Sequence, residues 1–182
     1  MMPYDHAAAG YLLTFILIKL LHPALTPDQV NSLLLWGLFW GVAVDWDMII
    51  SYSMLKSLKM SSKISHRRFL THTPLPWLAV GLSVYLLASS LYWKYFGLVI
   101  LAGAGSHLLV DSIEIGVMWL WPFSKKQYAL FEWADGDFFQ DEKNILVYYA
   151  KMYRYVYMRM RTFKVGLAVV IAALATFFIN RQ

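Results

Sequence analysis

The sequence predicts an all-α fold, a polytopic membrane helical bundle with about five transmembrane helices and a cytoplasmic interfacial helix. First, 59% of the 182 residues are hydrophobic and only 15% are charged, which exceeds what a water-soluble surface of this size usually tolerates. Second, the apolar residues are gathered in long runs. No Gly/Ser-rich or Pro-rich stretch divides the chain, so residues 1–182 are expected to form a single membrane-embedded domain.

Five apolar runs are candidates for membrane spans, since a spanning helix needs about 20 apolar residues and about 17 at the lower limit. They cover residues 7–21, 30–50, 74–93, 95–121 and 163–180. The first run is short, so it also fits a re-entrant or interfacial helix. Within residues 140–180, the aromatic and basic stretch 145–161 is expected to lie along the membrane interface before the last span.

The basic residues predict which ends of the spans face the cytoplasm, because Lys and Arg are enriched in cytoplasmic loops. Two segments, 51–73 and 122–162, carry most of them. In the first segment, no acidic residue accompanies Lys56, Lys59, Lys63, Arg67 and Arg68. Both segments are therefore expected to be cytoplasmic, which places the N-terminus inside if the first run crosses the membrane.

Acidic residues inside the apolar runs mark a candidate functional site, because ionisable groups are costly in a membrane helix. Asp45 and Asp47 lie near the predicted cytoplasmic end of the second run. The fourth run contains His107, Asp111 and Glu114. Their spacings of four and three residues predict that all three side chains share one helix face.

Four of the five histidines are predicted to gather at the same membrane face as these acids. They are His6, His66, His72 and His107, whereas His22 falls on the opposite side. Neutral imidazole and carboxylate together suit Zn²⁺ and other first-row divalent ions, and a cation compensates buried negative charge. Because the chain has no cysteine, a transition-metal site must be built from these two ligand types.

The polar residues could instead only pair with one another. In that interpretation, the His107–Asp111 pair holds two helices together by a hydrogen bond. The acids Asp45, Asp47 and Glu114 would then neutralise Arg67 and Arg68.

Several short motifs carry a family resemblance. They are His66-Arg67-Arg68-Phe69-Leu70-Thr71-His72-Thr73, Ser106-His107-Leu108-Leu109-Val110-Asp111 and Leu120-Trp121-Pro122-Phe123. With an N-terminal His and an Asp-x-Asp stretch before them, they make the chain similar, over roughly residues 4–124, to the predicted membrane-bound metal-dependent hydrolases of the LexA-binding inner-membrane-associated type. Thr73 stands where that family usually has Ser, and no Pro precedes Asp45, which leaves open whether Asp45 or Asp47 is the ligand.

The order His, Asp, His, His-x3-Asp also resembles, more distantly, zinc-dependent phospholipase C and the P1-type nucleases. The resemblance implies hydrolysis of a phosphoester of a lipid or lipid-linked substrate by a metal-activated water. Those enzymes have further histidine ligands downstream, whereas no His follows His107. One or two ions, most suitably Zn²⁺, are therefore expected.

Within this hypothesis each residue has a role. The expected metal ligands are His6, Asp45, His66, His107 and Asp111. Asp47 is a second ligand or the base that takes the water proton, and His72 is a ligand or the acid that protonates the leaving oxygen. Arg67 either holds phosphate oxygens or, like Arg68, serves as a topology anchor.

The expected partners are membrane lipids and the phosphate-bearing substrate. Nucleic acid is not expected, although the pI is about 9.3, because cytoplasmic loop bias accounts for the basic residues and no DNA-binding motif is present. An intramembrane metalloprotease is disfavoured, since neither His-Glu-x2-His nor its reverse occurs. The alternative function is a non-catalytic metal-stabilised scaffold, interaction protein or transporter, since members of the resembled family have been linked to binding a DNA-damage repressor.

Overall fold

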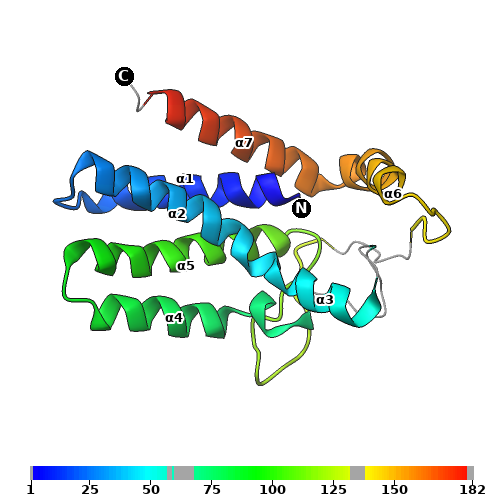
Figure 1. Ribbon diagram of the computed structural model, residues 1–182, viewed down its shortest axis with the longest axis horizontal. Helices are drawn as coiled ribbons and strands as arrows, with labels where there is room; N and C mark the ends of the chain where they lie inside the picture. The colour runs from blue at the N-terminus through cyan, green and yellow to red at the C-terminus, as the bar shows by residue number, and fades with distance from the viewer. Residues whose placement is uncertain (1, 57–58, 60–67, 132–137, 180–182) are drawn as a thin grey trace.

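The computed structural model describes residues 2–56, 59, 68–131 and 138–179, and these ranges are helical apart from loops and one isolated β-bridge. Helices α1, α2, α4 and α5 lie side by side, α7 runs along α1, and α6 lies beyond one end of the bundle (Figure 1). The helices are α1 (Pro3–Leu21), α2 (Pro27–Ala43), α3 (Asp47–Leu55), α4 (Pro74–Leu87), α5 (Leu91–Asp111), α6 (Ile145–Lys151) and α7 (Arg161–Ile179).

The all-α prediction is confirmed. Within the described ranges, four helices are long and apolar enough to cross a membrane: α1, the combined unit Pro27–Met54, α5 and α7. The unit Pro27–Met54 consists of α2 and α3 joined by the 3-10 turn η1 (Val44–Trp46). Helix α4 is apolar but has only 14 residues. The expected five spans are thus four long candidates and one shorter helix.

The boundaries of the third and fourth predicted spans were wrong. Helix α4 ends at Leu87 and α5 starts at Leu91, because the Ser90 hydroxyl caps α5 by accepting a hydrogen bond from the Trp93 N–H. Helix α5 ends at Asp111 instead of residue 121. Beyond it, the chain turns through Gly116, whose φ of 91° is readily adopted only by glycine.

Three helices meet closely at one level of the bundle. A Cβ atom on Gly41 of α2 would lie 2.3 Å from the His6 carbonyl oxygen of α1. On Gly103 of α5, it would lie 2.5 Å from the Trp40 Cβ atom of α2. Small residues allow this backbone approach between membrane helices, where packing rather than hydrophobic exclusion drives association. The approach brings His6 and His107 together.

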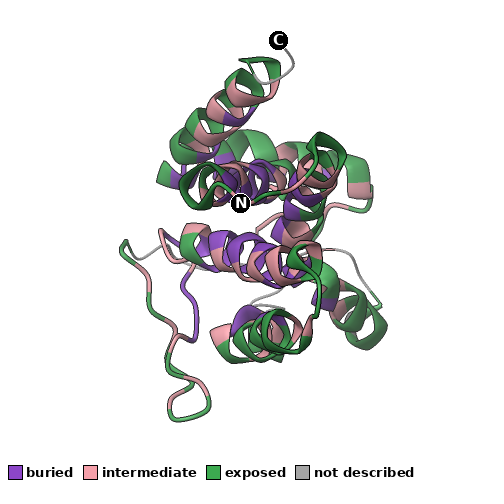
Figure 2. Cartoon of the chain, turned by 90° about the vertical axis from the view of Figure 1, so that its left-hand side faces the viewer, coloured by how far each residue is buried: buried purple, intermediate pink, exposed green. Residues whose placement is uncertain are grey.

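Burial follows the same arrangement. Buried residues gather where α1, α2 and α5 face one another, while α4 and α7 expose most of their outer surfaces (Figure 2). In a membrane, such exposed apolar faces contact lipid instead of water. Helix α5 packs against α1, α2 and α4, so it is the centre of the bundle.

The segment before α7 is helical but is not one regular helix. Helix α6 is followed by a π-helical stretch, η4 (Met152–Val156), and a 3-10 turn, η5 (Tyr157–Arg159). Tyr148 of α6 and Met152 and Val156 of η4 are buried in one cluster. The predicted position of residues 145–161 along the membrane interface stays a prediction.

Candidate metal centre

Six of the predicted site residues converge at one end of the bundle, Asp47 at the start of α3 among them. His6 comes from α1, Asp45 from η1, His72 from the 3-10 turn η3 (Leu70–His72), and His107 and Asp111 from the last turns of α5. Two groups of potential ligands form there, His6 with His107 and Asp111, and Asp45 with His72 and His107. The other two predicted site residues in the basic loop, His66 and Arg67, lie outside the described residues.

The distances between ligand atoms fit a small cation. The Asp45 Oδ1 atom lies 3.4 Å from His72 Nε2 and 3.5 Å from His107 Nε2. The Asp111 Oδ2 atom lies 3.5 Å from His107 Nε2 and 3.8 Å from His72 Nε2. Atoms bound about 2.0–2.1 Å from a tetrahedral zinc ion lie about 3.3–3.4 Å apart. The ligand atoms of Asp45, His72 and His107 therefore surround one point at which zinc could bind, and those of His6, His107 and Asp111 surround another.

A hydrogen bond fixes the orientation of the His107 ring. Its Nδ1 atom is 2.7 Å from the Gly41 carbonyl oxygen, which can only accept, so Nδ1 carries the proton. In the neutral ring, Nε2 then carries a lone pair, and this atom faces the carboxylates of Asp45 and Asp111. This Nε2 atom is buried without a hydrogen-bond partner in the described part of the chain. Acceptors facing acceptors require a proton or a metal ion between them.

The His72 ring is oriented in the same way by a carboxylate. Its Nδ1 atom lies 2.7 Å from Asp47 Oδ2, and the Thr71 hydroxyl donates a hydrogen bond to the same oxygen. The Trp77 indole N–H in turn donates to the Thr71 carbonyl oxygen at 2.6 Å. A carboxylate behind a metal-binding imidazole is a common outer contact that fixes the tautomer and strengthens the ligand. Asp45 and Asp47 thus occupy different positions in the centre.

His6 lies on the other side of Asp111. Its Nε2 atom is 3.5 Å from Asp111 Oδ1, and its ring stacks on that of His107 with centroids 3.6 Å apart. The preceding residue, Asp5, caps α1 by accepting from the Met2 N–H at 2.9 Å, and it also accepts a hydrogen bond from the Tyr157 hydroxyl. The C-terminal part of the chain is therefore attached to α1 beside His6.

The centre is almost completely enclosed. His6, His72, His107 and Asp111 are buried, whereas the Asp45 side chain keeps 16% of its surface exposed. Burial alone would lower the pKa of His72, but the carboxylates of Asp45 and Asp47 outweigh it and raise this pKa to about 9. In the metal-free protein, His72 can thus be the cation between two acids.

Glu114 does not belong to the centre. Because α5 ends at Asp111, the predicted face shared by His107, Asp111 and Glu114 was wrong. The Glu114 carboxylate instead accepts hydrogen bonds from the N–H groups of Arg161 and Thr162, both at 2.8 Å. It caps the start of α7, where a negative charge is favoured by the unpaired N–H groups.

Sequence reasoning also missed four residues that support the centre, namely Asp5, Gly41, Thr71 and Tyr157. Only Thr71 carried a signal, since it lies inside the His-x5-His motif beside His72. Thr73, where the resembled family usually has Ser, donates its hydroxyl proton to the Leu70 carbonyl oxygen at 2.7 Å. A serine hydroxyl could make the same bond, so the family difference is conservative.

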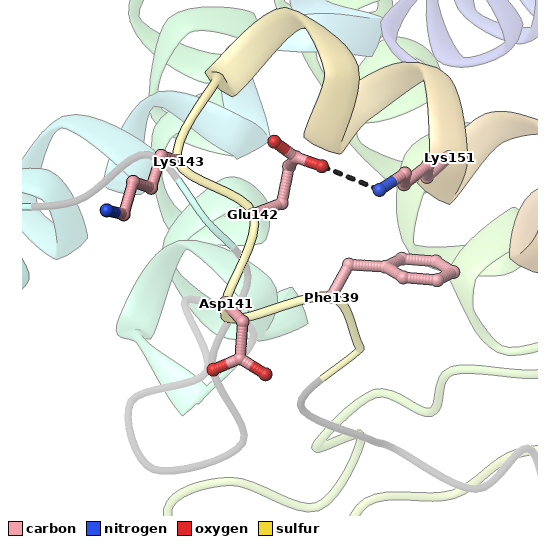
Figure 3. A pocket seen from close by; sticks show the side chains of 5 residues that line it. All are labelled: Phe139, Asp141, Glu142, Lys143 and Lys151. Atoms are coloured by element: carbon pink, nitrogen blue, oxygen red, sulfur yellow. Dashed lines mark hydrogen bonds and ion pairs between the residues drawn. The ribbon is translucent and has the colours of Figure 1, made fainter.

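A separate surface pocket of about 450 Å³ lies beside the start of α6 (Figure 3). It is lined by Phe139, Asp141, Glu142, Lys143 and Lys151. Lys151 Nζ donates a hydrogen bond to Glu142 Oε2 at 2.6 Å, and this contact lowers the pKa of the Glu142 carboxyl. None of the lining residues belongs to the buried histidine and aspartate cluster, so the pocket is distinct from the candidate metal centre.

The fold and the site together define a polytopic helical membrane protein with a buried His/Asp cluster that could hold a metal ion. The sequence comparison agrees with this class. The chain belongs to the YdjM inner membrane protein family, whose model matches residues 1–182. It is therefore an inner membrane protein. No curated protein and no solved structure matches the chain.

Proposed function

We propose that this chain is a membrane-bound metal-dependent hydrolase that cleaves a phosphoester of a lipid or lipid-linked substrate at the cytoplasmic membrane face. The observation that carries the proposal is the inward orientation of two imidazole Nε2 atoms. The Gly41 carbonyl and the Asp47 carboxylate hold His107 and His72 by their Nδ1 atoms. Both Nε2 atoms consequently face carboxylates, an arrangement suited to a divalent cation.

The proposed metal is Zn²⁺, as one or two ions. Asp45, His72 and His107 would hold the first ion. His6 and Asp111, whose Nε2 and Oδ1 atoms lie 3.5 Å apart, would hold a second ion or, together with His107, an alternative position of the same ion. Nitrogen and carboxylate oxygen ligands also suit other first-row divalent ions, so the choice of zinc is open to direct measurement.

The proposed chemistry divides between the ion and the protein. A bound divalent ion supplies a water that ionises near neutral pH and a Lewis acid for phosphate oxygens. Asp47 would hold the His72 ring in one tautomer, rather than act as the base considered from the sequence. Asp45, the one partly exposed carboxylate of the set, lies where a substrate would approach. Arg67, and His66 beside it, remain candidates for phosphate binding and for a further ligand.

The position of the centre supports a substrate that is bound to the membrane. Helix α5 has 21 residues and is about 31 Å long, close to the roughly 30 Å thickness of the hydrocarbon layer. His107 and Asp111 lie in its last turns, which supports a centre near the membrane boundary. Phosphate head groups lie at this level. The basic residues of segment 51–73 favour the cytoplasmic leaflet.

One observation favours a second candidate function. Four of the five proposed ligands are buried, and structural metal sites are typically closed, whereas catalytic sites keep an open position. A metal-stabilised scaffold without turnover would therefore have the same ligands. Catalysis requires that a water and a phosphoester reach the bound ion past the exposed side of Asp45.

The test measures metal content and turnover on the same purified protein in lipid nanodiscs. Metal content is measured for the native chain, His107→Ala and Asp111→Ala, with His22→Asn as the control. His22 is an exposed histidine that ends α1 in a left-handed conformation, which asparagine tolerates well. Loss of metal from the first two variants alone is expected. Full metal content in folded His107→Ala and Asp111→Ala proteins would contradict the metal centre.

Turnover is then assayed against phospholipids, polyprenyl phosphates and aryl phosphodiesters, with and without a chelator. The hydrolase proposal expects chelator-sensitive release of a phosphate product from at least one class. Metal-loaded protein that hydrolyses none of them would instead support the scaffold.

A further inference from the structure

A loop after the metal-binding helix exposes apolar side chains in an ordered conformation. Residues 117–128 form a hairpin whose ends are joined by two backbone hydrogen bonds between Val117 and Tyr128, of 3.1 and 2.9 Å. Its base is fixed to the bundle, because Val117 is buried in a cluster with Val44 and Leu108. The Trp119 indole N–H also donates to the Ser112 hydroxyl at 2.8 Å.

The tip of this hairpin, residues 120–126, is exposed, whereas the base is buried. Phe123 is 96% exposed and Leu120 is 52% exposed. The tip is nevertheless held by local bonds, since the Ser124 N–H donates to the Leu120 carbonyl oxygen at 3.0 Å and the Ser124 hydroxyl accepts from the Lys126 N–H at 3.1 Å. A rigid loop that presents a phenylalanine to water would leave a large apolar surface unburied, which is characteristic of an interaction site.

The hairpin lies at the end of the bundle that the short helix α4 does not reach. Helix α4 has 14 residues and is about 21 Å long, roughly 10 Å shorter than α5 beside it. Both helices meet at the end formed by residues 88–90, so α4 falls short at the metal-centre end. The hairpin projects sideways from the bundle at that end, beyond the start of α4 (Figure 1). Figure 2 shows the same sideways projection.

If α5 crosses the bilayer along its length, a tip that projects sideways at its end would run along the membrane surface. Its composition fits that surface, because interfacial segments combine aromatic and apolar residues with lysines. Lys125 and Lys126 are both exposed and directly follow the apolar part of the tip. Lysines near a bilayer are attracted to anionic head groups.

We propose that residues 120–126 are an interfacial anchor that inserts Phe123 and Leu120 into the leaflet bordering the metal centre, with Lys125 and Lys126 against anionic phosphates. The hairpin base begins at Val117, six residues after Asp111, so the anchor would fix the depth of α5's last turn relative to the head groups. The anchor does not depend on the proposed hydrolase chemistry, and its test needs no turnover.

The absence of cysteine from the chain makes a single-cysteine test direct. The Phe123→Cys protein is spin-labelled and reconstituted in vesicles of phosphatidylethanolamine and phosphatidylglycerol. Accessibility of the label to oxygen and to a water-soluble nickel chelate is then measured. Two reference labels bracket the result, Leu174→Cys on the exposed apolar face of α7 and Lys143→Cys on an exposed polar loop. Circular dichroism checks that each labelled protein is folded.

The proposal expects the label at position 123 to behave like the one at 174, with high oxygen and low nickel accessibility. Nickel accessibility equal to that at position 143 would overturn it. The charge component is tested separately by Lys125→Gln combined with Lys126→Gln, which should raise nickel accessibility at position 123. An unchanged value in these anionic vesicles would remove the lysines from the proposed anchor.

Discussion

Replacement of Gly41 by alanine tests whether the close approach of α1 and α2 builds the metal centre. The new Cβ atom would lie 2.3 Å from the His6 carbonyl oxygen and 3.0 Å from its carbonyl carbon. Ordinary contact needs about 3.4 Å, so the two backbones would have to separate by roughly 1 Å. Overpacking of this kind costs about 1–3 kcal/mol, and here the strained atoms are backbone atoms that cannot rotate away.

The same shift would displace two ligands. Gly41 supplies the carbonyl oxygen that orients His107. The added Cβ atom would also push against the backbone carbonyl group of His6. We therefore expect Gly41→Ala to lower both the free energy of unfolding and the metal content. Small displacements matter because metal ligands must be held within fractions of an ångström of their bonding positions.

Gly105→Ala is the matched control. It lies on α5 near His107, and a Cβ atom there would meet nothing within 4 Å. Alanine is favoured over glycine in a helix by about 1 kcal/mol, so this variant should be as stable as the native chain or slightly more stable. Denaturant unfolding in detergent and elemental analysis give the two readouts. If Gly41→Ala matched Gly105→Ala in stability and metal content, the packing argument would be refuted.

Three further predictions concern individual contacts. Asp47→Asn should weaken metal binding about 10–100-fold in a competition titration, because the amide cannot hold the His72 tautomer as the carboxylate does; unchanged affinity would exclude this role. Metal affinity should strengthen as pH rises toward about 9, by up to about tenfold per unit, since the ion displaces the proton from His72; calorimetry that finds constant affinity would contradict a protonated His72. Glu114→Ala should cost about 1–2 kcal/mol of unfolding free energy through the lost cap of α7 while metal content stays intact; metal loss would reassign Glu114 to the centre.

The raised pKa of His72 also predicts how the stability of the metal-free protein depends on pH. The pKa of His72 is raised from 6.5 to about 9 by its two carboxylate neighbours. The stabilisation from this ion pairing is therefore complete below about pH 6.5 and is lost as the pH rises through about 9. Metal-loaded protein should lack this loss, because a bound ion replaces the proton. The two forms should thus diverge in stability on the alkaline side.

The sequence was sufficient for features that depend on local spacing. Hydropathy predicted the helical class, and the spacing of four residues between His107 and Asp111 predicted that both face the same site, as they do. The same reasoning failed for Glu114, because the helix ends three residues earlier. No apolar pattern signals that end: the run continues in apolar residues that form the hairpin base instead of a helix.

The roles of Asp45 and Asp47 could not be separated from the sequence, because the distinction depends on a distant turn. Only when η3 brings His72 beside η1 does Asp47 meet Nδ1 and Asp45 face Nε2. The Gly41 carbonyl and the Tyr157 hydroxyl are similar cases, since each acts across a separation of 66 or 152 residues. Tertiary hydrogen bonds of this range leave no periodic signal.

The arrangement of contacts explains why metal binding and folding should be coupled at one end of the bundle only. Segments α1, η1, η3 and α5 each contribute candidate ligands there. A bound ion would connect η1 and η3 to α5 in one group of ligands, or α1 to α5 in the other. At the other end, α4 and α5 are held by close glycine contacts between Gly81 and Gly97. Removal of the ion should therefore loosen the centre and its hairpin, while the spanning helices stay packed.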